Sequence, residues 1–136
     1  MPTHWLLLLG STLADDGRLR QALAALAELG SVRLLAPLQH GPGSRDPQRR
    51  YFNALVELVR SDGRDALVTS LKDIEQRLGR RRDDREVAID IDLLAVRSDG
   101  PWLADAHALA KGEFAQAHTR ALLHHAGLAI QATRDA

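Results

Sequence analysis

The sequence predicts an α+β fold in which helices pack on one face of an antiparallel sheet. Three observations support this class: apolar runs of strand length, two segments with aliphatic residues at helical spacing, and short polar turns between them. The chain has 136 residues, enough for one domain with a substantial core. Because the sequence contains no repeat and no linker, we expect residues 1–136 to form a single domain.

The first predicted strand covers residues 3–10, an apolar run that ends in glycine. A helix is expected next, capped by Asp15 or Asp16 and ended by Gly30. Its inner stripe is formed by four leucines: Leu19, Leu23, Leu26 and Leu29. Residues 31–39 form a second predicted strand, which Pro37 marks as an edge strand or a strand end.

Residues 40–50 contain two glycines and two prolines, which predicts a loop of functional length. Residues 51–60 alternate and predict a third strand, with Asn53 as its polar exception. A second helix is expected over residues 64–78, between a Ser-Asp-Gly start signal and Gly79. Its inner stripe has four members: Leu67, Leu71, Ile74 and Leu78.

Residues 86–96 are the most informative stretch, a predicted strand in which aliphatic residues alternate with two aspartates. Residues two apart in a strand point to the same face, so Asp90 and Asp92 share one face. Two neighbouring carboxylates repel each other, and a divalent cation relieves this most simply. Mg²⁺ favours one or two carboxylates together with substrate phosphates.

Four arginines lie just before this strand, within residues 79–85. Arginine guanidinium groups match phosphate oxygens, so this stretch and the aspartates together hold the groups that phosphoryl transfer needs. A solvated mixed-charge loop beside an exposed sheet face explains the same residues equally well.

Beyond this strand, residues 98–101 predict a turn, Trp102 starts a short strand and residues 113–125 form a helix. The element order is therefore βαββαβ with a C-terminal extension, which is the ferredoxin-like arrangement.

Lys and Arg together number 18, as do Asp and Glu, so net charge recruits neither nucleic acid nor a membrane. Aromatic residues make up only 4%, which disfavours an RNA-binding module of this fold. No cysteine is available for disulfides or thiolate metal sites. Without a recognisable signal peptide or membrane-spanning run, a cytoplasmic location is expected. For the oligomeric state we expect a monomer or a weak dimer.

Five stretches occur in an order that resembles the pyrophosphokinase family acting on 6-hydroxymethyl-7,8-dihydropterin in folate biosynthesis. These are residues 9–13, 51–54, 74–82 and 90–94, and Leu103 with His107. The resemblance implies transfer of the β,γ-pyrophosphoryl group of ATP to the hydroxymethyl oxygen of the pterin, with release of AMP. It also implies that Asp90 and Asp92 hold two Mg²⁺ ions.

Further roles follow from the same resemblance. Arg80 and Arg82 would contact ATP phosphates, and His107 would donate to a phosphate oxygen. Arg85 would join them at ATP only if its loop bends to replace an arginine that the family has nearer to the aspartates. Tyr51 would stack on the pterin and Asn53 would bond its amide edge. Local structure accounts for some of these residues as well, because arginines after a helix complement its dipole and a lone histidine is usually at the surface. Glu75 is expected to pair with a nearby arginine, and His118 to lie on a surface helix.

Several positions depart from the family pattern. Val87 stands where an arginine is expected, and His40-Gly41-Pro42-Gly43 replaces a proline-rich pterin loop. Counting from His107 puts Glu113 in the place of a second arginine and Phe114 near that of a pterin-binding aromatic. An alternative register, which requires an insertion, assigns the arginine role to Arg120, for ATP, and the aromatic role to Leu122. These departures leave open a divergent protein that binds pterin or nucleotide with little turnover, or that has an altered substrate.

Overall fold

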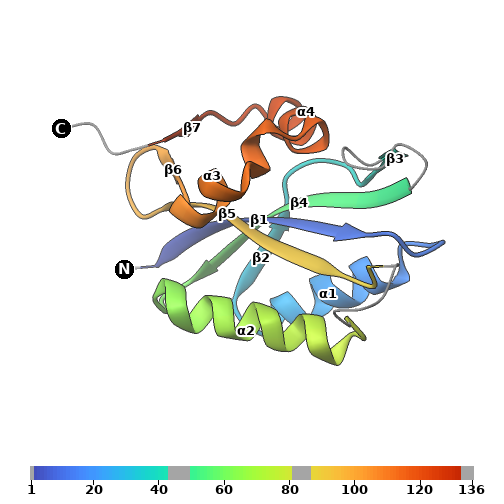
Figure 1. The fold of residues 1–136 in the computed structure, drawn as a ribbon. Helices are drawn as coiled ribbons and strands as arrows, with labels where there is room; N and C mark the ends of the chain where they lie inside the picture. The colour runs from blue at the N-terminus through green and yellow to red at the C-terminus, as the bar shows by residue number, and fades with distance from the viewer. Residues whose placement is uncertain (1, 43–49, 81–86, 133–136) are drawn as a thin grey trace.

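The computed structural model describes residues 2–42, 50–80 and 87–132. A seven-stranded sheet separates two helical layers (Figure 1). Its strands are β1 (Thr3–Ser11), β2 (Ser31–Leu34), β3 (Gln39–Pro42), β4 (Arg50–Arg60), β5 (Asp90–Arg97), β6 (Trp102–Ala104) and β7 (Ile130–Gln131). The helices are α1 (Gly17–Ala27), α2 (Arg64–Arg77), α3 (Ala106–Lys111) and α4 (Ala117–Ala126), with a 3-10 turn η1 (Glu113–Ala115). The predicted mixed α+β class is confirmed.

The sheet is built around β1, the apolar strand at the start of the chain. The strand order is β2-β4-β1-β5-β6-β7, with β3 also paired to β4, and every pair except β6–β7 is antiparallel. In this register Gly10 of β1 lies between Asn53 of β4 and Asp90 of β5. The pairing therefore brings two predicted site residues together from distant parts of the sequence.

Alternation along β1 supplies a core on each face of the sheet. Leu7 and Leu9 belong to one core, with the stripes of α1 and α2, whereas Leu6 and Leu8 belong to the other. The second core includes Trp102 and Leu122, so the C-terminal segment packs onto the face opposite α1 and α2. What the sequence presents as an extension is a second helical layer (Figure 1).

Most predicted elements are confirmed, but four need correction. The strand predicted over residues 31–39 ends at Leu34, ahead of Pro37. Residues 40–42 pair with β4 as part of β3, although a loop was expected over residues 40–50. The strand predicted to start at residue 86 starts at Asp90. The helix predicted over residues 113–125 is divided, because the chain is extended at Gln116 between η1 and α4.

None of the helices in the described part of the chain has the length and hydrophobicity required to span a bilayer.

Gly30 provides a test of the packing between the turn after α1 and β4. A Cβ atom added at Gly30 would lie 2.2 Å from the carbonyl oxygen of Val59, a backbone atom that cannot rotate away. We expect Gly30→Ala to lower the free energy of unfolding by about 1–3 kcal/mol in urea denaturation. Gly41→Ala is the matched control, since a Cβ there would have no neighbouring atom of the described residues within 4 Å. Equal stability of the two variants would contradict this account.

Candidate active site

Asp90 and Asp92 stand at the start of β5 and face the C-terminal helices. The intervening Ile91, with Ile89 and Leu93, belongs to the core under α1 and α2. The predicted division of this strand into a carboxylate face and an aliphatic face is therefore confirmed. The two aspartates differ in exposure, since the Asp90 side chain is 37% exposed and that of Asp92 only 19%.

Arg80 is fixed against the first of these carboxylates. Its Nη1 donates to Asp90 Oδ1 at 2.8 Å and to the backbone oxygen of Ile89 at 3.3 Å. The chain reaches this position because Gly79 adopts the left-handed conformation (φ +96°) directly after α2. Arg80 is thus hydrogen-bonded to the strand that carries the aspartates.

Glu75 of α2 attaches the helix to the same strand. Its Oε2 accepts the backbone N–H of Ile91 at 2.8 Å and lies 3.9 Å from Arg80 Nη1. The pKa of Glu75 is raised to about 7, chiefly by burial and also by the charge of Asp90, while the Ile91 hydrogen bond and Arg80 oppose this rise. The expected pairing with an arginine is present, but the hydrogen bond to β5 was not anticipated.

Lys111 and Glu113 meet Asp92 from the C-terminal layer. Lys111 Nζ lies 3.7 Å from Asp92 Oδ1 and 3.7 Å from Glu113 Oε1. The pKa of Asp92 is raised to about 8, chiefly by burial and also by the negative charges of Asp90 and Glu113, while Lys111 opposes this rise. Asp92 is therefore a carboxylate whose ionisation is costly unless more positive charge arrives.

The carboxylates lie where two cavities of about 390 and 280 Å³ adjoin. The two cavities share five lining residues: Arg80, Asp90, Asp92, Lys111 and Glu113. The larger cavity extends between α2, β5 and α3 toward Lys72 and His107. The smaller cavity extends toward Tyr51, Asn53, Gln116 and His118. A ligand in either cavity would reach the same carboxylates.

An ion pair sets the position of α3 and hence of His107. Arg64 at the start of α2 donates from Nε (2.6 Å) and Nη2 (3.1 Å) to the two carboxylate oxygens of Asp105. Asp105 also caps α3 by accepting the Ala108 N–H. Burial alone would raise the pKa of Asp105, but the hydrogen bonds and charge of Arg64 lower it.

The smaller cavity ends at the turn after β1. Asn53 is buried, and a Cβ at Gly10 would lie 3.2 Å from its Oδ1, so glycine allows the amide to sit beside β1. Thr12 then bonds to the backbone of Val87. It donates its N–H to the Val87 oxygen at 2.9 Å and accepts the Val87 N–H on Oγ1 at 2.6 Å. Val87, where the family pattern has an arginine, is thereby tied to the end of β1.

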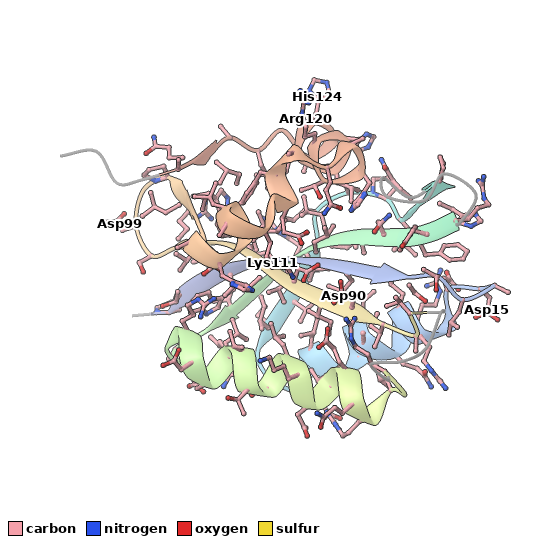
Figure 2. All side chains as sticks on the ribbon, viewed as in Figure 1. Asp15, Asp90, Asp99, Lys111, Arg120 and His124 are labelled. Atoms are coloured by element: carbon pink, nitrogen blue, oxygen red, sulfur yellow. The ribbon has the colours of Figure 1, made fainter. Side chains whose placement is uncertain are left out.

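The structure brings together six of the residues predicted for the site: Tyr51, Asn53, Arg80, Asp90, Asp92 and His107. Phe114 packs against the second core. Arg120 lines a separate shallow groove on α4, and Figure 2 shows it projecting with His124 from the outer side of that helix. Arg82 and Arg85 lie outside the described residues.

Sequence reasoning gave no site role to Lys111 or His118, which line the cavities. His118 was expected at a helix surface, yet it is half-buried and burial lowers its pKa. Lys111 ends α3, and His118 lies in the first turn of α4 after the turn η1. Cavity-facing positions of this kind carry no periodic signal in a sequence.

Within residues 2–42, 50–80 and 87–132, no three histidine, aspartate or glutamate side chains form a complete metal-binding group. Asp90 and Asp92 fit a different kind of cation site. Mg²⁺ is commonly held by one or two carboxylates and completed by water and phosphate oxygens. The excess negative charge around Asp92 favours such a cation.

Comparison with protein-family models gives one match. The model described as 7,8-dihydro-6-hydroxymethylpterin-pyrophosphokinase (HPPK) covers residues 6–125. This range includes most of β1, the two cavities and α4 except its last residue. Among curated proteins, no relative of the chain is found.

The raised pKa of Asp92 gives a stability prediction with a defined sign. The folded protein holds this proton up to about pH 8, whereas an unfolded aspartate loses it near its ordinary value of 3.8. Between these values the folded state binds more protons, so this group's contribution to stability falls as pH rises. We expect Asp92→Asn to be more stable than the parent protein at pH 8 by about 2 kcal/mol or more, in the presence of EDTA.

Urea titrations at a series of pH values measure this difference, which should shrink as pH falls from 8 toward 4. The matched control is Asp99→Asn, a change at an exposed turn. A stabilisation that does not vary with pH would contradict the assignment to Asp92 ionisation.

Proposed function

The chain belongs to the 7,8-dihydro-6-hydroxymethylpterin-pyrophosphokinase family, and we propose that it transfers the β,γ-pyrophosphoryl group of ATP to 6-hydroxymethyl-7,8-dihydropterin, releasing AMP. The carrying observation is the position of Asp90 and Asp92 where two cavities adjoin. A two-substrate transfer requires such a shared point, because both reactants must reach one set of charged groups. The predicted cytoplasmic location, single domain and monomeric or weakly dimeric state stay predictions.

For the fold, we propose the ferredoxin-like arrangement for β1, α1, β2, β4, α2 and β5. The order β2-β4-β1-β5 of their strands supports it, as does the packing of α1 and α2 on one face. The remaining elements form an addition that encloses the site from the other face.

Asp90 and Asp92 would hold the Mg²⁺ ions, two in our proposal, which would neutralise phosphate charge when bound. Arg80 faces the same point and would contact a phosphate oxygen with the guanidinium donors that Asp90 leaves unused. His107, held by the Arg64–Asp105 pair at the start of α3, would donate to a phosphate in the larger cavity. Arg82 and Arg85 remain proposed phosphate contacts.

We assign the pterin to the smaller cavity. Asn53 offers a buried amide with both a donor and an acceptor, which suits the amide edge of a pterin ring. Tyr51 lies in the same cavity and would stack on the ring. Phe114 stays a proposed contact that would require rearrangement from its packing position in the second core.

The presence of Glu113 supports a second candidate function. In this case the protein is a divergent family member that binds pterin or nucleotide with little turnover, or that acts on another substrate. This glutamate stands in the expected place of an arginine, and it is buried beside Asp92. Replacing a phosphate-binding cation by an anion would remove transition-state stabilisation unless another cation compensates.

The activity assay uses ATP, Mg²⁺ and the hydroxymethyldihydropterin, and follows AMP release. The parent protein should produce AMP, whereas Asp92→Asn should reduce kcat at least about 1,000-fold, because the carboxylate charge is lost. Since this substitution is expected to stabilise the fold, lost activity could not be attributed to unfolding.

Arg20→Met, on the exposed side of α1, is the control and should retain activity. Pterin or nucleotide binding in calorimetry without AMP would favour the second candidate. Absence of both binding and AMP release would refute both candidates.

A further inference from the structure

Lys111 is a positive group at the carboxylate site that none of the roles above requires. It is the last residue of α3, and its ammonium group lies equally far, 3.7 Å, from Asp92 and Glu113. Both cavities include it in their lining. In Figure 2 Lys111 lies beside β5, near the labelled Asp90 and well apart from Arg120 on α4.

The manner in which Lys111 is held differs from that of Arg80. Arg80 makes a 2.8 Å hydrogen bond to Asp90 and a second to the backbone of Ile89. The 3.7 Å distances of Lys111 are those of ion pairs without a direct hydrogen bond, and its side chain is 44% exposed. Lys111 can therefore turn toward a ligand at a smaller cost than Arg80.

A position at the end of a helix does not explain this arrangement. Basic residues often occupy the last turn because they complement the helix dipole. That effect is small for a helix of only six residues, and it would not direct the side chain toward Asp92 on β5. The buried Glu113 contributes a second attraction from the same side, which keeps the ammonium group at the site.

We propose that Lys111 is a triphosphate-binding residue of this site, an inference that rests on the proposed function. In the unliganded protein its ammonium group lies between the carboxyl groups of Asp92 and Glu113. When Asp92 takes part in binding a Mg–triphosphate complex, Lys111 keeps Glu113 as its anchor and turns its remaining donors to phosphate oxygens. The Lys111–Glu113 pair thus supplies a cation where the family pattern has an arginine, and it limits the repulsion between Glu113 and phosphate.

The test is calorimetry with two probes in the presence of Mg²⁺: a non-hydrolysable ATP analogue and inorganic tripolyphosphate. Lys111→Met should weaken binding of both probes roughly 10- to 100-fold, the range expected for losing a charged hydrogen bond. Lys111→Arg should stay within about threefold, because the charge is retained.

Arg20→Met is the matched control, since it removes one positive charge from α1 outside both cavities. Equal affinities of the parent protein and Lys111→Met for tripolyphosphate would overturn the inference. An equal loss of affinity in Arg20→Met would also overturn it, because the effect would then come from the net charge of the protein and not from the position of Lys111. If the parent protein binds and turns over ATP while Lys111→Met matches it, the proposed function stands and only the role of Lys111 fails. If the parent protein binds neither probe, both fail.

Discussion

Repulsion among carboxylates at the start of β5 is the constraint around which the site is arranged. Asp90, Asp92, Glu75 and Glu113 converge there, and Arg80 and Lys111 are the cations paired with them among the described residues. Bringing buried carboxylates together costs folding free energy when they are ionised. The raised pKa values of Glu75 and Asp92 reflect this cost. Binding of a cation and a polyphosphate would relieve the repulsion between these carboxylates. The same arrangement therefore lowers the stability of the free protein and raises its affinity for the ligand.

The fold makes this arrangement possible by using both faces of one sheet. α1 and α2 bury the aliphatic side of β5, which leaves its aspartate side free to face the C-terminal layer. That layer has its own core on the opposite face of the sheet. It also places Lys111, Glu113 and His118 in the lining of the smaller cavity. The central position of β1 places β4 and β5 on either side of Gly10, so the smaller cavity is lined by residues of all three strands.

Sequence periodicity predicted the elements with clear apolar patterns. The leucine stripes of the two long helices and the alternation around Asp90 and Asp92 fix their faces, and the resemblance identified the family. The helix α3 was missed because its six residues, AHALAK, are too few to form a stripe. β3 was missed because glycine and proline within residues 39–42 favour a loop in isolation, and its pairing with β4 overrides that preference. Lys111 could not be assigned because its role depends on residues brought close only by folding.

The two ends of α2 are attached to different walls of the larger cavity. Arg64 at its first turn is bonded to Asp105 at the head of α3, and Glu75 near its last turn is bonded to the backbone of β5. One face of the helix between them, with Val68, Leu71 and Lys72, lines the cavity. The length of α2 therefore fixes the distance between the carboxylates on β5 and the Arg64–Asp105 pair. This distance sets how long a ligand can be if it is to extend from one to the other inside the larger cavity.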